Sequence, residues 1–315
     1  MTKLNKWQNE ILKLEKRSDK DLNRNLWNAY NDSLKEVRAQ LKEYMDEYED
    51  LPYYKQQQTG KLAELEKEIV ELLNSAYPKA KYEVTDFKRK ELEDGYYTTM
   101  YQLESETGAQ LDFLGLDTEF MRNTITNPVA GKTLSKRLYS SRTKLADRAT
   151  SELRNGMIQG KSYAVIAKAI SGHTEANYKQ AMRIARTEGG RLRSIGKQTA
   201  YSEAKDMGID MQKEWMSSLD NRTRSSHREL DGQTVEIEED FVSPSGAKGQ
   251  GPRLMGRANE DIHCRCTTIT IVDGIRPGSR LAKNETLVNG KIVHEYESIP
   301  YKNYGEWSKS RIRTN

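Results

Sequence analysis

Apolar residues between positions 22 and 48 recur at alternating steps of four and three. The series is Leu22, Leu26, Tyr30, Leu34, Val37, Leu41, Tyr44 and Tyr48. Because an α-helix turns once every 3.6 residues, this spacing gathers the side chains on one helical face. The pattern predicts a long amphipathic helix. It is expected to end near Leu51-Pro52, since the residue before a proline is disfavoured in the helical conformation.

Two more helical segments are predicted before residue 107. A second stripe contains Leu62, Leu65, Ile69 and Leu72. It predicts a helix that stops before Tyr77-Pro78 and forms an antiparallel hairpin with the first helix. A third helix, rich in tyrosine, is expected from about residue 85 to 106. Residues 108–131 contain three glycines and one proline, so they are predicted to be a loop-rich connection after a helical region, 1–107.

Helical periodicity returns after this connection. A helix is predicted over 134–155, and a shorter one is expected to begin after Ser162 and to end at Gly172. The longest predicted helix covers 175–207 and stops at Gly208. Gly189 and Gly196 lie on its apolar face. Because glycine lowers helix propensity, their presence there predicts that another backbone approaches closely.

The period changes to two after Gly208. Residues 209–215 alternate apolar and polar, which predicts a half-buried strand, and further strands are expected at 235–237 and 264–272. The expected fold class is α+β: long amphipathic N-terminal helices followed by a helical segment and a small antiparallel β-rich domain, together at 132–274. Residues 275–315 are expected to form a tail whose aromatic side chains serve as a docking segment. These aromatic residues are Tyr301, Tyr304 and Trp307.

Composition argues against a membrane protein and favours solvated helices or assembly surfaces. Hydrophobic residues make up 35% of the chain, charged residues 31%, and the mean hydropathy is −0.89. No apolar run approaches the roughly 20 residues that span a bilayer. The first residues also lack the apolar core of a secretory signal, so we expect the chain to be made and to reside in a cytoplasm.

Positive charge is concentrated in the middle of the chain. Residues 131–200 carry 15 Lys and Arg against 4 Asp and Glu, whereas the whole chain has a net charge of only +4. Such a segment suits contact with phosphate groups. The alternative is that these residues only solvate exposed helix faces.

Three short motifs follow one another in the second half of the chain. They are residues 184–188 (Ile-Ala-Arg-Thr-Glu), residues 220–232 around His227 and Asp231-Gly232, and residues 261–266 (Asp-Ile-His-Cys-Arg-Cys). Together with Lys213-Glu214-Trp215, Phe241 and Pro244-Ser245-Gly246, they resemble the frame of the Mu-F-like minor head (head morphogenesis) proteins of tailed double-stranded DNA phages. His263 departs from that frame, where asparagine is expected before Cys-Arg-Cys.

The resemblance implies a minor capsid component rather than an enzyme. Its expected partners are the portal protein during procapsid assembly, the scaffold or major capsid protein, and packaged double-stranded DNA. The expected location is the host cytoplasm during assembly, then the virion head near the portal vertex. Within the basic segment, four residues are expected to face DNA: Arg183, Arg191, Arg193 and Lys197. The acidic N-terminal helices or the aromatic tail are expected to dock on the portal or capsid.

The two cysteines, Cys264 and Cys266, leave two interpretations open. On one strand face they would lie roughly 6 to 7 Å apart, so their thiolates would converge on a metal only if the strand bends. With His227 and either His263 or Asp231 they would complete a structural zinc site. Alternatively, the thiols pack as small buried apolar groups while His227 bonds to backbone.

Charged residues of the three motifs are expected to form a polar network that ties the long helix to the β-region. These residues are Arg186, Glu188, Asp220, Arg222, Arg224, Asp231 and Arg265. For the motif on the long helix, the alternative is a solvated or locally paired helix face.

A nucleic-acid-processing enzyme or toxin module is the alternative function. His227 would act as a general base while Arg222 or Arg224 clamps a phosphate. The sequence has no second histidine in a comparable motif, no paired carboxylates at metal-binding spacing and no glycine-rich phosphate loop. We therefore expect no enzymatic activity.

Overall fold

The structure is a computed structural model that describes residues 6–129, 131–276, 278–288 and 291–309. The first five residues of the expected 1–107 region and the last six of the expected tail lie outside the described residues. Packing divides the chain into two compact units. One contains Arg17–Phe87 and Ile125–Arg186, here called the helical unit. The other contains Met1–Lys16, Lys88–Thr124 and Thr187–Asn315, here called the mixed unit.

The two units do not follow the linear order of regions that the sequence suggested. Three long helices, α1 (Lys6–Tyr48), α3 (Lys61–Thr107) and α6 (Tyr163–Asp206), each contribute residues to both units. None of the described helices has an apolar stretch sufficient to cross a bilayer.

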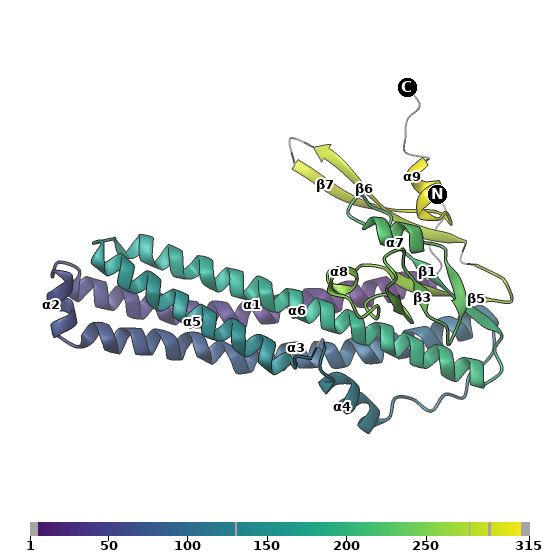
Figure 1. Cartoon of the computed structure of the whole chain (residues 1–315), viewed down its shortest axis with the longest axis horizontal. Coiled ribbons are helices and arrows are strands. Elements are labelled where there is room, and N and C mark those ends of the chain that lie inside the picture. Colours follow the sequence, from purple (N-terminus) through teal and green to yellow (C-terminus); the bar gives the residue numbers. More distant parts are fainter. Residues whose placement is uncertain (1–5, 130, 277, 289–290, 310–315) are drawn as a thin grey trace. The chain divides into compact units, whose positions relative to one another are not determined.

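The helical unit is built on the apolar stripes that the sequence displayed. Its parts of α1, α3 and α6 run beside α5 (Leu134–Ile158), and the short α2 (Tyr53–Gln58) follows α1 (Figure 1). The stripe predicted on α1 is confirmed, because its members from Leu22 to Tyr44 are at most 6% exposed and share one core with the other three long helices.

Contacts between α1 and α3 confirm the predicted antiparallel hairpin. Asn25 Nδ2 donates to Glu83 Oε2 at 2.9 Å, and the hydroxyls of Ser33 and Ser75 lie 3.1 Å apart. As residue numbers rise along α1, those of the contacting residues on α3 fall. The first helix also ends at Tyr48, close to the predicted stop before Pro52.

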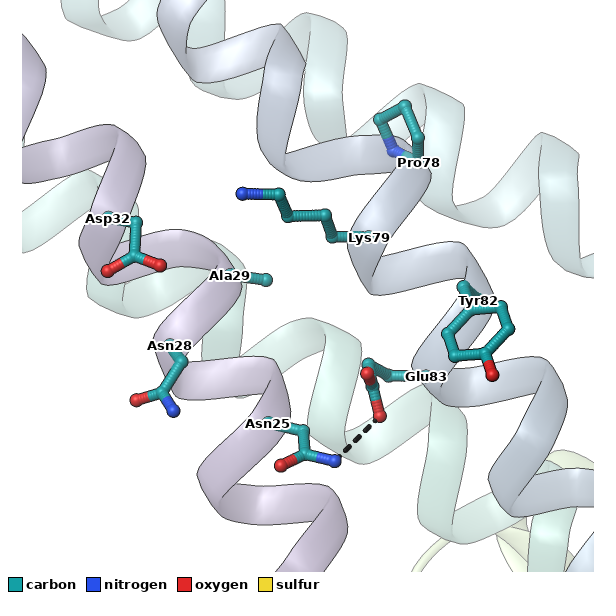
Figure 2. A pocket seen from close by; sticks show the side chains of 8 residues that line it. All are labelled: Asn25, Asn28, Ala29, Asp32, Pro78, Lys79, Tyr82 and Glu83. Atoms are coloured by element: carbon teal, nitrogen blue, oxygen red, sulfur yellow. Dashed lines mark hydrogen bonds between the residues drawn. The ribbon is translucent and has the colours of Figure 1, made fainter.

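The helix end predicted before Pro78 is wrong, because α3 continues through this residue to Thr107. Proline inside a helix costs about 3 kcal/mol or more. Buried Leu73 and Val84 lie on either side of it, and burying one such side chain contributes about 1.5–3 kcal/mol. Packing therefore exceeds the local penalty. Figure 2 shows Pro78 on α3 among the residues that line a hollow between α1 and α3, with Asn25, Asn28 and Asp32 on the α1 side.

The predicted break at Gly172 is wrong for the same reason. Residues 163–206 form one helix of 44 residues, in which Gly172 is exposed while Ile170 and Thr174 are buried. One helical glycine costs only about 1 kcal/mol. The predicted stop at Gly208 is confirmed, since α6 ends at Asp206 and Gly208 has a φ of +92°.

The mixed unit contains the β-structure, which confirms the α+β class. Its central sheet is antiparallel in the order β2 (Thr234–Glu236), β1 (Met211–Met216), β5 (Thr267–Val272). The short strands β3 (Phe241–Val242) and β4 (Lys248–Gly249), of two residues each, pair antiparallel in a second small sheet. The connecting helices are α4 (Thr118–Thr126), which begins inside the predicted loop, α7 (Ser225–Leu230) and α8 (Ala258–Asp261).

The strand predicted from Cys264 is shorter than expected, because β5 begins only at Thr267. His263 has a φ of +59°, in the left-handed region. The ladder with β1 also ends here, because Met216, the last residue of β1, pairs with Thr267. Both cysteines therefore lie in the segment that leads into β5.

The C-terminal region is folded rather than a free tail. Strands β6 (Ser279–Val288) and β7 (Lys291–Pro300) form an antiparallel hairpin followed by α9 (Tyr304–Lys309). The sequence carried a signal for it, since these strands flank Asn289-Gly290, a dipeptide typical of two-residue hairpins. Tyr304 and Trp307 are buried with Leu219 in one cluster. The expectation that these two rings form a docking segment is wrong, because they already pack within their own unit.

A close backbone approach occurs between α3 and α6 in the mixed unit, as the sequence predicted for Gly196. A Cβ atom at Gly196 would lie 2.3 Å from the carbonyl oxygen of Leu92, and one at Gly95 would lie 2.3 Å from that of Arg193. Both distances are shorter than any tolerated contact. The two glycines therefore let the helix backbones touch.

We predict that Gly196→Ala lowers the melting temperature, although alanine favours a helix by about 1 kcal/mol over glycine. The added methyl group meets backbone, which cannot move aside as a flexible side chain would. Gly172→Ala is the matched control, since its Cβ meets nothing within 4 Å, and it should raise the melting temperature. Thermal unfolding followed by circular dichroism measures both variants. Equal gains for the two variants would contradict the close contact.

Candidate metal centre and buried polar contacts

Three side chains with metal-ligand chemistry converge in the mixed unit. His227 lies on α7, while Cys264 and Cys266 lie just before β5. His227 Nδ1 is 3.3 Å from Cys266 Sγ and 3.7 Å from Cys264 Sγ, and the three atoms lie within 4.8 Å of one another. All three residues are at most 3% exposed. The imidazole and the two thiols therefore converge as a metal site requires. The cysteines do so from the segment before β5 and not from a bent strand.

The two thiols are free and differ in acidity. Hydrogen bonding from Cys266 lowers the pKa of Cys264 to about 7 against the opposing effect of burial, and Arg253 and Arg224 add to the lowering. The neighbouring Cys264 thiol and burial together raise the pKa of Cys266.

Glu260, from α8, fixes the imidazole of His227. Its Oε2 lies 2.9 Å from His227 Nε2 and accepts a hydrogen bond from the Ser226 hydroxyl, also at 2.9 Å, while Ser245 donates to Oε1 at 2.7 Å. Burial alone would raise the pKa of Glu260, but hydrogen bonds from Ser245, Ser226 and His227 lower it overall. An ionised carboxylate only accepts hydrogen bonds, so the imidazole proton is on Nε2. The lone pair of Nδ1 then faces the sulfurs.

Aromatic rings enclose this group. The Trp215 ring from β1 packs edge-on against His227 with centroids 5.4 Å apart, and Phe241 packs at the same distance against Trp215. These side chains belong to one buried cluster with both cysteines. Apolar side chains therefore pack against the group, while the Ser217 hydroxyl lies 3.6 Å from Cys266 Sγ.

The predicted four-ligand set is not assembled. His263 is exposed and is not a member of the group that His227, Cys264 and Cys266 form. The backbone of His263 is in the left-handed conformation, so its side chain does not point in the same direction as that of Cys264. Asp231, the alternative fourth ligand, is fully occupied by other partners described below.

Part of the predicted polar network exists around Asp220. This residue is 1% exposed and forms an ion pair with Arg265, whose Nη2 lies 2.8 Å from Asp220 Oδ1. It also accepts the backbone N–H of Arg222 at 2.9 Å, while the Arg222 side chain is exposed. Arg224 donates to the backbone carbonyl of Glu260 at 3.1 Å. Hydrogen bonds therefore tie the residue 220–224 turn to the segment that carries the cysteines.

Asp231 holds the C-terminal hairpin and α9. Its side chain is fully buried and pairs with Arg280 on β6 through two contacts of 3.0 Å. The backbone N–H groups of Ser217 and Tyr304 donate to the same carboxylate, each at 2.5 Å. The sequence identified Asp231 but not Arg280, because a single arginine in a strand is ordinarily solvent-exposed.

Arg186 and Glu188 do not join this network. Arg186 pairs with Asp19 at 2.7 Å in the helical unit, whereas buried Glu188 pairs with Lys88 at 2.7 Å in the mixed unit. Two residues apart on a helix, their side chains point in nearly opposite directions. The single network that the sequence predicted is therefore several separate contacts.

Two of the four residues expected to face DNA are turned into the protein. Arg193 is 8% exposed and pairs with Glu91 at 2.7 Å, with further carboxylates nearby. Lys197 donates to Thr267 Oγ1 at 2.7 Å, and burial lowers its pKa to about 8. Arg183 is exposed and Arg191 half-buried. The DNA-facing expectation is wrong for Arg193 and Lys197, because these side chains are engaged within their own unit.

The proposed general base and phosphate clamp are not brought together. His227 is 2% exposed and its Nε2 contacts Glu260, while Arg224 donates to backbone carbonyls. Neither group is directed toward a shared substrate position. The arrangement is that of a packed interior.

We predict that Asp231→Ala destabilises the chain by about 3–5 kcal/mol, since it leaves the Arg280 charge buried without its partner. Asp210→Ala, at an exposed position after α6, is the control and should change stability by less than about 0.5 kcal/mol. Urea unfolding followed by tryptophan fluorescence compares them. The 279–309 segment should also become sensitive to protease in the first variant alone. Equal stability of both variants would contradict the role of Asp231.

The chain is similar to known proteins over most of its length. Residues 147–269, which include His227 and both cysteines, match the family model described as phage Mu protein F like protein. The chain is 40% identical over 315 residues to the NAD(+)–arginine ADP-ribosyltransferase EFV of Enterococcus faecalis, but it spans only 62% of that protein's length. No solved structure matches it.

Two further relatives extend the comparison. An uncharacterised protein of Haemophilus influenzae is 28% identical over 211 residues, 65% of this chain and 40% of that one. Minor head protein GP7 of Bacillus phage SPP1 is 29% identical over 306 residues, which are 96% of this chain and 94% of that protein. Residues 147–269 are thus similar to the phage Mu protein F like family, and nearly the whole chain is similar to a phage minor head protein.

Proposed function

We propose that the chain is a minor head component that associates with the portal protein during procapsid assembly and contacts packaged DNA. The observation that carries this proposal is the extent of the similarity to a minor head protein, 94% of that protein's length. If the two proteins shared a single domain only, long segments of each protein would remain unmatched. Scaffold or major capsid protein is a further partner in this proposal, and the head interior near the portal vertex is the proposed location.

The most suitable surface for DNA lies on α5. This helix carries six basic and two acidic residues. Lys136, Lys144 and Arg148 are exposed on it, and Lys144 and Arg148 are one helical turn apart. Exposed cations at such spacing attract phosphates along a DNA backbone without reading its sequence. These residues replace Arg193 and Lys197 in the proposal.

The most suitable surface for the portal is the end of α1 that leads into α2. Five exposed carboxylates lie within residues 43–50: Glu43, Asp46, Glu47, Glu49 and Asp50. The sequence indicated two docking elements, the acidic N-terminal helices and the aromatic tail. Because Tyr304 and Trp307 of the tail are packed internally, we assign docking to the helices. An acidic surface of this kind favours a basic patch on its partner through electrostatic complementarity.

We predict that neutralising this acidic end weakens capture of the portal protein by about tenfold, equivalent to about 1.4 kcal/mol. The variant combines Glu43→Gln, Asp46→Asn and Glu47→Gln. The matched control removes three exposed charges elsewhere on the helical unit, through Asp32→Asn, Glu36→Gln and Asp147→Asn. Affinity capture after co-expression with the portal protein of the same phage measures the difference. Failure of the unaltered chain to capture portal protein would refute the association itself.

We predict that Lys136→Gln, Lys144→Gln and Arg148→Gln together reduce the salt dependence of DNA binding by about 0.9 in logarithmic slope for each lost phosphate contact. The control variant, Lys20→Gln, Lys42→Gln and Lys55→Gln, removes the same charge from exposed positions on α1 and α2. Gel retardation of double-stranded DNA across a salt series gives both slopes. An identical decrease for the two variants would show that net charge, rather than α5, governs binding.

An enzymatic role is the second candidate, favoured by the name of the Enterococcus faecalis relative. We infer that this chain does not catalyse that reaction, because the same residues align with a minor head protein and the rest of the relative lies outside the match. Incubating the chain with labelled NAD(+) and an arginine-containing acceptor tests this inference. Transfer of the label would overturn it.

A further inference from the structure

The separations in the His227, Cys264 and Cys266 group match those around a tetrahedral zinc ion. With Zn–S distances of about 2.3 Å and Zn–N distances of about 2.0–2.1 Å, a tetrahedral site places nitrogen and sulfur about 3.6 Å apart. The observed Nδ1 to Sγ distances of 3.3 and 3.7 Å lie on either side of this value. Only small side-chain shifts would be needed to admit the ion.

The imidazole is already prepared as a ligand. Glu260 accepts the hydrogen bond from Nε2 at 2.9 Å, which directs the Nδ1 lone pair toward both sulfurs. A carboxylate behind a histidine ligand is the usual arrangement around protein-bound zinc, where it orients the ring and increases its basicity. Ser226 and Ser245 in turn hold the carboxylate. These two hydrogen bonds hold Glu260 in the position from which it orients the ring.

Charge balance favours a divalent ion in this apolar setting. Thiolate is the form of cysteine that binds metal, so both thiols would release their protons on binding. Two thiolates and a neutral imidazole around one divalent cation have no net charge, which reduces the penalty of burial. Sulfur and imidazole donors also favour zinc over magnesium or calcium.

We propose that His227 Nδ1, Cys264 Sγ and Cys266 Sγ bind one Zn²⁺ ion that joins α7 to the segment leading into β5. The chain supplies three ligands, and water takes the fourth position. Because all three residues are at most 3% exposed, the ion is closed to a substrate and its role is structural. It links the ends of a turn-rich stretch, residues 227–264, whose regular elements are short. The proposal is independent of portal or DNA binding.

Elemental analysis of the full chain, purified without chelator, tests the site. We expect one zinc per chain in the unaltered protein and in His263→Ala, which removes the neighbouring exposed histidine. Cys264→Ser and Cys266→Ser should lose the metal. Glu260→Gln should retain it with an affinity reduced by about 10- to 100-fold, measured by competition with a chelator. Loss of zinc in His263→Ala would overturn the assigned ligand set.

Cobalt substitution of the unaltered chain keeps the test decisive if the cysteine variants do not fold. Co²⁺ in the site should give thiolate charge-transfer bands and the intense visible bands of tetrahedral geometry. Weak bands of octahedral cobalt would contradict the proposal. So would sub-stoichiometric zinc with both thiols reduced, a disulfide between Cys264 and Cys266, or a different metal at one equivalent.

Discussion

Buried carboxylates organise the β-containing part of this protein. Asp220, Asp231 and Glu260 each lie in the interior and each accept hydrogen bonds from elements far away in sequence. Removing such a charge from water costs several kcal/mol unless its partners are in place. The positions of Arg265, Arg280 and His227 are therefore coupled to those of the acids. Strands, short helices and the C-terminal hairpin must assemble together, because no single element satisfies its own carboxylate.

Because of this constraint, the buried polar residues stabilise the fold, whereas binding to partners depends on other, exposed residues. The most elaborate chemistry, around His227 and the cysteines, is enclosed and suited to holding the fold. The charged outer faces of the helices are exposed to partners, and such faces suit an assembly protein. The same residues are similar both to a minor head protein and to a protein named as a transferase. This agrees with the general rule that one fold can serve different functions, which depend on its surfaces and on attached regions.

The sequence predicted what depends on periodicity and missed what depends on distant partners. The stripe from Leu22 to Tyr44 identified a helix and its buried face. The period-two pattern before Trp215 identified a strand, β1, but not the burial of Glu214, which lies on its predicted polar face. The breaks at Pro78 and Gly172 failed, because a local penalty of a few kcal/mol is smaller than the burial on either side. Arg193 lay on the predicted helix, but periodicity does not reveal that acids of α3 face it. Glu260 was not identified for the same reason, since only the fold brings α8 to His227.

The enclosed His227, Cys264 and Cys266 group is the zinc ligand set that we propose. X-ray absorption at the zinc edge, recorded on the full chain purified without chelator, tests it most directly. We expect two sulfur neighbours at about 2.3 Å and lighter atoms, one of them an imidazole nitrogen, at about 2.0–2.1 Å. A shell of oxygen and nitrogen atoms without sulfur would contradict it, because zinc would then be bound elsewhere.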